Sequence, residues 1–435
     1  MAKQDHVSKN TLESEVINTR LRRRNRLDRA FKWLGLGAVF SALLALLWLL
    51  ISIVGTGYKA FYQHTVSIEI ELAADTIDPG NDRDPDQLRR ASYRNLVRNA
   101  LLEKFPDVSQ PSQQLELFRI LSTTGAANVV RQTVYKNPSL VGQRQVFRLP
   151  VSDDVDQLLK GNIDAAASAA VRKVSDRQLD WINALQSDGT LKPRLKTNFF
   201  LHPDSGDPEL AGIAGALVGS LMALFVAFIV CIPIGVGAGL YLEEFAPKNA
   251  FVSFVEININ NLAAMPSIVY GLLGFAVFLN FFGMPRSAPL VAGLVLALMM
   301  MPIIIIATRS ALQAVPESMV TSALSLGASP MQAVLHHKFP LAVPGILTGT
   351  IIGMAQALGE TAPLLMIGMV AFVTDIPSNV TDPSTALPVQ IFLWADAAER
   401  AWAENTSAAI LVLLCFLIVM NGFAVFLRSR LDKRR

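Results

Sequence analysis

The sequence is poor in cysteine and in charged residues. Only two of its 435 residues are cysteine, and because Cys231 and Cys415 both lie inside apolar stretches, neither a disulfide framework nor a cysteine-ligated zinc site is expected. Charged residues make up 17% of the chain, against roughly 25% in soluble proteins, whereas apolar residues make up 52%. This composition excludes a disordered chain, a collagen-like chain and an ordinary cytosolic enzyme, and it predicts an integral membrane protein.

Motifs of nucleotide and metal chemistry are also missing. The pattern Gly-x-x-x-x-Gly-Lys-Ser/Thr does not occur, so the chain itself is not expected to bind ATP or any other nucleotide cofactor. His336 and His337 are adjacent, which points them in different directions on a helix, and no cysteine or carboxylate accompanies them. We therefore predict no metal site and no catalytic residues.

The few charges are distributed unevenly along the chain. Residues 1–32 carry nine basic and four acidic side chains, and residues 428–435 carry five basic and one acidic. Residues 59–208 carry nineteen of each sign, whereas residues 209–427 carry only five basic side chains against eleven acidic ones. The net charge of +3 is therefore the sum of two basic tails, a neutral hydrophilic block and an acidic apolar block.

A first membrane-spanning helix is predicted over residues 33–54. These 22 or so mostly apolar residues are enough to cross a hydrocarbon core about 30 Å thick. A cleavable signal peptide is the alternative, but the apolar stretch exceeds the usual roughly 7–15 residues and no small-x-small cleavage site follows it. The basic tail 1–32 places the N-terminus in the cytoplasm by the positive-inside rule, and its position beside a span disfavours nucleic-acid binding as its role.

Residues 55–208 form a hydrophilic block that a single crossing places outside the cytoplasm. Alternation of polar and apolar residues predicts a strand from Thr65 to Leu72, and the Asp-, Pro- and Gly-rich segment 75–86 predicts a loop. Helical spacing of apolar residues predicts helices over Pro85–Leu102, Ser112–Leu121 and Val155–Leu185. We expect a small inserted α/β domain used either for recognition or for packing.

Five further apolar segments follow: Ile213–Leu242, Leu262–Phe282, Leu290–Thr308, Gly345–Val373 and Ala408–Leu427. With the first span they make six, an even number that returns the C-terminus to the cytoplasm, where the basic tail 428–435 is expected. The predicted fold class is an all-α polytopic membrane protein with six transmembrane helices, whose membrane domain is 209–427 and whose α/β domain is inserted at 55–208. This topology places the loop 309–344 in the cytoplasm.

The loop 309–344 is too long for a turn and is partly apolar. Pro316 suits the first turn of a helix, and Gly327 suits the left-handed residue that ends one. Ser329 and Pro330 then predict a second helix, as its N-cap and first helical residue. Each helix has an apolar face, formed by Met319, Ala323 and Leu326 in the first and by Met331, Val334 and Leu335 in the second. Such a pair of exposed amphipathic helices predicts docking to another protein.

This pattern, followed by Phe339-Pro340-Leu341, resembles the EAA loop of the permeases of binding-protein-dependent ABC importers. In that family the loop forms the coupling helices that sit in a groove of the ATPase subunit. Thr321-Ser322-Ala323 stands where Glu-Ala-Ala is usual, whereas Gly327 keeps its expected place. The resemblance implies that the residues coupling this chain to an ATPase are Thr321, Ala323, Gly327, Ala328, Met331 and Pro340.

Three further segments are similar to the phosphate-importer branch of the family, the PstA-like permeases: Asn261–Gly271, Ala357–Leu365 and Ala386–Phe392. The resemblance covers roughly 210–430 and implies the type I ABC importer permease fold, phosphate as cargo, and the bacterial inner membrane with both termini cytoplasmic. It also implies three kinds of protein partner: a second permease subunit (PstC-like), an ATPase dimer that binds Mg-ATP (PstB-like), and a periplasmic phosphate-binding protein (PstS-like).

Glu360 is predicted to lie in the middle of a span, where an ionisable side chain costs about 2.5–3.5 kcal/mol or more unless it faces a partner or water. It therefore either lines the substrate pathway, with Thr361 beside it, or forms a structural ion pair; the pathway is the preferred hypothesis. Pro363 should break the helix at this point, which is tolerated only where the backbone is buried in protein or wet. A broken helix near the bilayer midplane is typical of substrate passages.

Gln356 and Arg309 complete the predicted pathway residues. The resembling permeases commonly carry an arginine near the position of Gln356, so at this position the chain can offer phosphate hydrogen bonds but no charge. Arg309 lies at the cytoplasmic end of a span, where it is either a snorkelling anchor or a pathway residue. Because residues 209–427 hold only five basic side chains, part of the positive charge that phosphate needs is expected from the partner permease.

Two alternative functions remain. A membrane-anchored sensor or assembly factor, with residues 59–208 as its receptor domain, would account for the large external block but not for the loop 309–344 or for Glu360. An ABC permease for another oxyanion would share every feature above. In the external loop, Pro388 and Trp394 are candidates either for a surface that receives a binding protein or for packing within the loop.

Overall fold

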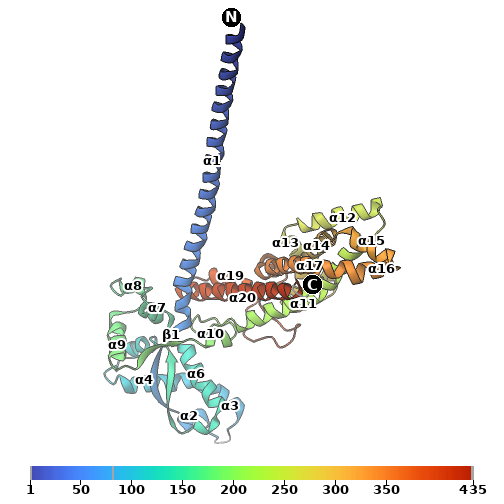
Figure 1. Ribbon diagram of the computed structural model, residues 1–435. Coiled ribbons are helices and arrows are strands. Elements are labelled where there is room, and N and C mark those ends of the chain that lie inside the picture. Colours follow the sequence, from blue (N-terminus) through green and yellow to red (C-terminus); the bar gives the residue numbers. More distant parts are fainter. Residues whose placement is uncertain (1, 81–82, 433–435) are drawn as a thin grey trace. The chain divides into compact units, whose positions relative to one another are not determined.

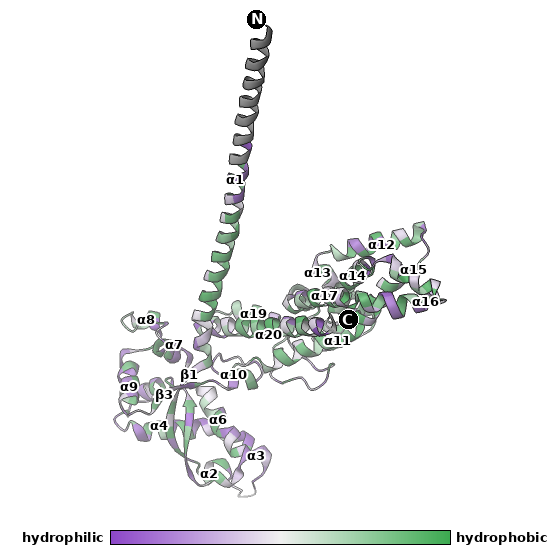
Figure 2. Cartoon of the chain, in the orientation of Figure 1, coloured by the Kyte–Doolittle hydropathy of each residue, from purple (hydrophilic) through white to green (hydrophobic). Residues whose placement is uncertain are grey.

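The computed structural model describes residues 2–80 and 83–432 (Figure 1), in two compact units, Met1–Gly55 and Thr56–Arg435. The first unit is a single continuous helix, α1 (Ala2–Gly57), whose last two residues enter the second unit. Most of its side chains between residues 33 and 54 are exposed and apolar, the green part of α1 in Figure 2, as a lipid-facing helix requires. The helix extends well before the predicted span because the preceding residues include neither proline nor glycine.

The second unit begins with a short 3₁₀ turn (Tyr58–Phe61) and a three-stranded antiparallel sheet in the order β2-β1-β3. Its strands are β1 (Tyr62–Glu71), β2 (Arg144–Pro150) and β3 (Leu191–Leu195). In the central strand, Ile68 lies opposite Phe147 of β2. Alternation buries Val66, Ile68 and Ile70 on one face, so the strand predicted from Thr65 to Leu72 is confirmed.

Helices pack around this sheet, chiefly α4 and α6, whose buried leucines and valines share one apolar cluster with β1. Their bounds are α2 (Ala74–Ile77), α3 (Pro85–Arg90), α4 (Tyr93–Lys104), α5 (Pro111–Phe118), α6 (Thr123–Lys136), α7 (Asp153–Leu159), α8 (Ala169–Arg172), α9 (Asp176–Ser187) and α10 (Asn198–Leu201), with a 3₁₀ turn at Pro138–Leu140. The helix predicted over Ser112–Leu121 is confirmed as α5.

Other predictions in this region need correction. The helix predicted over Val155–Leu185 is wrong: Gly161 (φ +74°) follows α7, and Lys173 (φ +57°) follows α8, so the chain forms three separate helices there. Likewise Pro85–Leu102 is divided into α3 and α4 at Ala91–Ser92, and α2 overlaps the start of the segment 75–86 that was predicted as a loop. Helix α6 and strands β2 and β3 were not predicted.

The remainder of the second unit consists of long apolar helices and short connecting ones. They are α11 (Ala214–Glu244), α12 (Ala250–Ala263), α13 (Ser267–Gly274) with its π-helical extension (Phe275–Phe281), α14 (Pro289–Gln313), α15 (Glu317–Ser325), α16 (Pro330–Ala333) with its π-helical extension (Val334–Lys338), α17 (Phe339–Gly359), α18 (Ala362–Met366), α19 (Leu387–Ala395) and α20 (Arg400–Asp432). In the described residues both cysteines are free: Cys231 is buried on α11 and Cys415 is exposed on α20.

Five helices in the described part of the chain are long and apolar enough to cross a membrane, and a sixth span is obtained only if a bent pair counts as one. That pair, Ala250–Ala263 and Ser267–Phe281, bends by 103°, so the span predicted over Leu262–Phe282 is not one straight helix. Pro266 lies at the bend, and the Tyr270 hydroxyl donates to the Leu262 carbonyl across it at 2.8 Å.

The span predicted over Gly345–Val373 is also wrong in its bounds. The candidate membrane helix runs from Pro330 to Gly359, and the chain after α18 is not helical up to Val373. Gly368 takes a left-handed conformation there (φ +91°), which stops α18 from continuing. Glu360 therefore lies at the end of a helix, and not in the middle of one as predicted.

Candidate transport pathway and coupling surface

The predicted loop 309–344 is shorter in the structure, because residues 309–313 belong to α14 and residues 339–344 to α17. Between them the chain has the predicted helix–glycine–helix form. Helix α15 ends at Ser325, and Gly327 adopts a left-handed conformation with φ of +90°. The Ser329 hydroxyl accepts from the Gln332 backbone N–H, while the Gln332 side chain accepts from the Ser329 backbone N–H, which closes a capping box at the start of α16. Both the glycine corner and the Ser329-Pro330 helix start are confirmed.

The two short helices expose part of their apolar faces. Met319, Leu326 and Met331 are exposed, Leu326 to 89%, whereas Ala323 and Val334 are buried within the chain. Of the other residues expected to contact an ATPase, Thr321 and Gly327 are exposed, and Ala328 and Pro340 are half-buried. The exposed methionine and leucine side chains thus form the part of the loop that can contact another protein without rearrangement.

Ion pairs connect this loop to the helices behind it. Lys338, which follows α16, lies 2.7 Å from a carboxylate oxygen of Glu244 at the end of α11. On α14, Arg309 pairs with Glu243 of α11 at 3.1 Å and with Glu256 of α12 at 2.9 Å. Two carboxylates already balance the charge of Arg309, so the geometry favours a role as a link among three helices over a role as a free cation for phosphate.

Three of the four predicted pathway residues, Gln356, Glu360 and Thr361, lie at or just after the end of α17, whereas Arg309 lies on α14. Helix α17 stops at Gly359, and Glu360 and Thr361 separate it from α18, so the break expected before Pro363 is present. The Gln356 side chain is exposed, and those of Glu360 and Thr361 are half-exposed. The Glu360 carboxylate forms neither a hydrogen bond nor an ion pair with any of the described residues.

Close backbone packing holds this break in place. A Cβ atom on Gly271 of α13 would lie 2.7 Å from the Cα atom of Pro363, so only glycine permits this approach of α13 to α18. The non-helical chain after α18 is tied to its surroundings by the hydroxyl of Thr385, which donates to the Met369 carbonyl at 3.0 Å. These contacts give the broken segment a defined position rather than that of a loose loop.

A cavity of about 760 Å³ lies elsewhere, between α5, α7, α8, α9 and the segment 207–209. Six of the charged residues that line it are acidic and two are basic: Glu116, Asp153, Asp154, Asp207, Glu209 and Glu399 against Arg119 and Lys173. Burial, together with the neighbouring carboxylates, raises the pKa of Asp153 to about 7. This excess of carboxylates would repel phosphate, and the sequence analysis identified no site among these residues.

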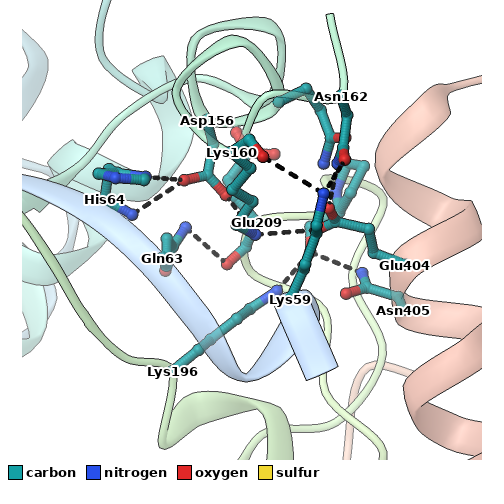
Figure 3. Close-up of polar contacts among 12 residues, drawn as sticks. Lys59, Gln63, His64, Asp156, Lys160, Asn162, Lys196, Glu209, Glu404 and Asn405 are labelled. Carbon is teal, nitrogen blue, oxygen red and sulfur yellow. Dashed lines mark hydrogen bonds and ion pairs between the residues drawn. The ribbon is translucent and has the colours of Figure 1, made fainter. Parts of the chain in front are cut away.

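A buried polar cluster joins α7 to α20 (Figure 3). The Lys160 ammonium lies 2.8 Å from Asp156 and 2.9 Å from Glu404, and Asn162 donates to the other oxygen of Glu404. Burial opposes the charged form of Asp156, but the hydrogen bonds from His64 and Lys160 outweigh it and hold the pKa of Asp156 below its usual range. Burial also opposes the charge on Lys160, yet its two carboxylate partners raise its pKa overall.

The sequence alone does not reveal this cluster, because its members are far apart in the chain. Lys196 belongs to it as well, donates to the Pro208 carbonyl at 2.8 Å, and has its pKa lowered by burial to about 8. In the described part of the chain, no group of three or more His, Cys, Asp or Glu residues could hold a metal ion. The cluster therefore connects structural elements and does not form a metal centre.

Comparison with known proteins places the membrane part of the chain in a family. The model for the binding-protein-dependent transport system inner membrane component matches residues 231–435, and that for a domain of unknown function, DUF3333, matches residues 18–169. The chain is 33% identical over 222 residues to the probable ABC transporter permease protein YqgI of Bacillus subtilis, which covers 50% of this chain and 74% of YqgI.

Other similarities concern proteins of the same kind. The chain is 31% identical over 224 residues to the phosphate transport system permease protein PstA of Mycobacterium leprae, which covers 51% of this chain and 72% of that protein. Among solved structures, an inward-facing MetNI methionine ABC transporter aligns with a TM-score of 0.41 and 18% identity, over 50% of this chain and 95% of the other. The chain therefore belongs to the inner-membrane permeases of binding-protein-dependent ABC transport systems, as a PstA-like transporter subunit that is not an enzyme and that works with a separate ATPase and a substrate-binding protein.

Proposed function

We propose that the chain is the permease subunit through which an ATP-driven importer moves inorganic phosphate across the inner membrane. The observation that carries this proposal is the likeness to PstA proteins, whose names assign them to phosphate transport, over about half of the chain. The choice of phosphate over another oxyanion rests on that likeness alone. The charge of residues 209–427 does not support it, because this segment is acidic overall.

The pathway is proposed to run past Gln356, Glu360 and Thr361. These side chains are exposed or half-exposed, and a charged group that faces lipid costs about 2.5–3.5 kcal/mol. The surface that they form therefore needs protein or water against it. A second, PstC-like permease subunit would cover it and supply the missing positive charge. Gln356 and Thr361 can then offer hydrogen bonds to phosphate, while Glu360 opens or closes the passage by binding or releasing a cation of that second subunit.

Coupling to ATP hydrolysis is proposed to pass through the loop 309–344. Its exposed apolar residues, Met319, Leu326 and Met331, suit a groove of a PstB-like ATPase dimer, which binds Mg-ATP. Lys338 lies just after this surface and pairs with α11, so displacement of the loop would reach a membrane helix directly.

In this proposal both termini are cytoplasmic and the α/β domain at 55–208 lies in the periplasm. The support is the basic character of residues 1–32 and 428–435, together with the cytoplasmic position that an ATPase-coupling loop requires. A PstS-like binding protein would deliver phosphate on the periplasmic side. Trp394 is only 3% exposed, so we assign it to packing within the chain and not to the surface that receives this protein.

Phosphate uptake by cells that carry Glu360→Gln tests the pathway. We expect uptake to fall at least about tenfold while the amount of protein in the membrane stays normal, because the amide cannot pair with a cation. Glu69→Gln is the matched control, since Glu69 is exposed on β1, outside the membrane helices. Full uptake by Glu360→Gln would refute the role of this residue, and uptake of another oxyanion in preference to phosphate would change the proposed cargo.

A further inference from the structure

The α/β domain is joined to α19 through Asp204, in the segment that leads from the domain to α11. The Asp204 carboxylate accepts hydrogen bonds from Gln390 Nε2 at 2.9 Å and from Trp394 Nε1 at 3.1 Å, both on α19. Gln390 is 1% exposed, so water cannot replace Asp204 as its partner. Burial raises the pKa of Asp204 although both donors act to lower it, so the carboxylate is held in an environment that disfavours its charge.

A second set of contacts connects the same domain to α20. Glu404 accepts from Lys160 and Asn162, and Asn405 Nδ2 donates to the Pro208 carbonyl at 2.9 Å (Figure 3). Aromatic side chains continue the contact: the ring centroids of Phe199 and Trp394 are 6.4 Å apart, and those of Trp394 and Trp402 are 5.4 Å apart. Polar and aromatic contacts together tie the domain to α19 and to the first turns of α20.

The start of α19 shares a buried apolar cluster with residues on both sides of the break after α17. Ala386 and Val389 belong to the same buried apolar cluster as Leu358, which precedes Glu360, and Leu364, which follows Thr361. The backbone N–H of Leu387 donates to the Ser220 hydroxyl of α11 at 2.8 Å, which fixes the first turn of α19 to α11. Gln390, which donates to Asp204, directly follows Val389 of this cluster, so α19 connects Asp204 to the cluster around the break.

We propose that Asp204 is a positioning residue through which the α/β domain controls the Glu360–Thr361 break. The inference rests on the proposed function, because it gives the domain a role in the transport cycle of that pathway. Displacement of the domain changes the position of α19, and α19 in turn supports or releases the residues on both sides of the break. The domain is thus a control element of transport rather than a separate receptor.

The test is the number of phosphate ions transported per ATP hydrolysed. The complete transporter, with its second permease, ATPase and binding protein, is reconstituted in proteoliposomes, and the chain carries Asp204→Ala or Trp394→Phe. We expect Asp204→Ala to lower this ratio at least about fivefold while ATP hydrolysis continues, and Trp394→Phe, which removes one donor, to lower it less. Tyr93→Phe is the matched control, because it removes a buried hydrogen bond to the Leu88 carbonyl inside the domain.

If Asp204 only stabilised the fold, Asp204→Ala would reduce the amount of assembled transporter. The transporter that still assembled would move the same number of phosphate ions per ATP. An unchanged ratio in Asp204→Ala therefore overturns the inference, as does a Tyr93→Phe ratio that falls equally. If Asp204→Ala does not assemble, Trp394→Phe decides in the same way. If the unaltered transporter hydrolyses ATP with its binding protein present but moves no phosphate, the proposed function fails and this inference fails with it.

Discussion

Lys160 is the most informative residue to remove from the cluster in Figure 3. Its ammonium group lies between two carboxylates, 2.8 Å from Asp156 and 2.9 Å from Glu404, and its side chain is 9% exposed. Lys160→Met keeps the apolar stem but leaves two buried carboxylates without their shared cation. Breaking a buried ion pair from one side costs about 3–5 kcal/mol, so we expect a loss of this size in the free energy of unfolding.

The partner substitution should cost less. After Glu404→Gln, Lys160 still pairs with Asp156, and the new amide can still accept from Lys160 or Asn162. A loss of about 1–3 kcal/mol is therefore expected, below that of Lys160→Met. In the double variant the two losses should not add, because each removes part of the same network.

Thermal unfolding of the purified full-length chain measures both effects. At about 2–4 °C per kcal/mol for a domain of the size of 55–208, Lys160→Met should lower the Tm of this domain by roughly 10 °C. Arg144→Gln serves as the control and should change the Tm little, because Arg144 and its partner Glu71 are exposed. A Tm for Lys160→Met equal to that of the unaltered chain, or a larger loss for Glu404→Gln, would refute this account of the cluster.

Three other outcomes follow from particular positions. The pKa of Asp153 is raised to about 7, so its ionisation destabilises the fold as the pH rises from about 4 to 7; Asp153→Asn should raise the Tm at pH 8 and have little effect near pH 4. Gly327→Ala should weaken co-purification of the ATPase, because alanine at φ +90° costs roughly 1–2 kcal/mol although its Cβ would meet no other atom within 4 Å. Gly271→Ala should reduce phosphate uptake at normal protein amounts, because its Cβ would force α13 away from Pro363; unchanged uptake would show that this close approach is dispensable.

Local signals in the sequence predicted the coupling loop well. Gly327 and the Ser329-Pro330 pair each determine a backbone conformation within a few residues, and the structure has the left-handed residue and the capping box at these positions. Strand β1 was predicted for a similar reason, since alternation of buried and exposed residues is read directly from consecutive positions.

The membrane breaks were harder to place. Apolar composition shows that a segment can cross a membrane, but it does not predict where the helix bends or ends. The bend at Pro266 and the end of α17 at Gly359 are two such places. Pro363 did indicate a break, but α17 ends four residues earlier than that proline, which moved Glu360 from the middle of a helix to its end.

Contacts between distant segments could not be predicted. Lys160 and Glu404 are 244 positions apart, and Asp204 and Trp394 are 190 apart, and no periodic pattern relates such pairs. Lys160, Glu404 and Asp204 each look by themselves like ordinary surface polar residues. Only the folded chain shows that each lies beside its distant partner.

ATP-driven uptake of radiolabelled phosphate by the reconstituted transporter shows whether this chain carries phosphate past Glu360. We expect phosphate to accumulate in proteoliposomes only when ATP, the ATPase, the binding protein and this chain are all present, and we expect Glu360→Gln to remove most of this uptake. ATP hydrolysis without phosphate accumulation, or phosphate accumulation at the full rate with Glu360→Gln, would contradict this expectation.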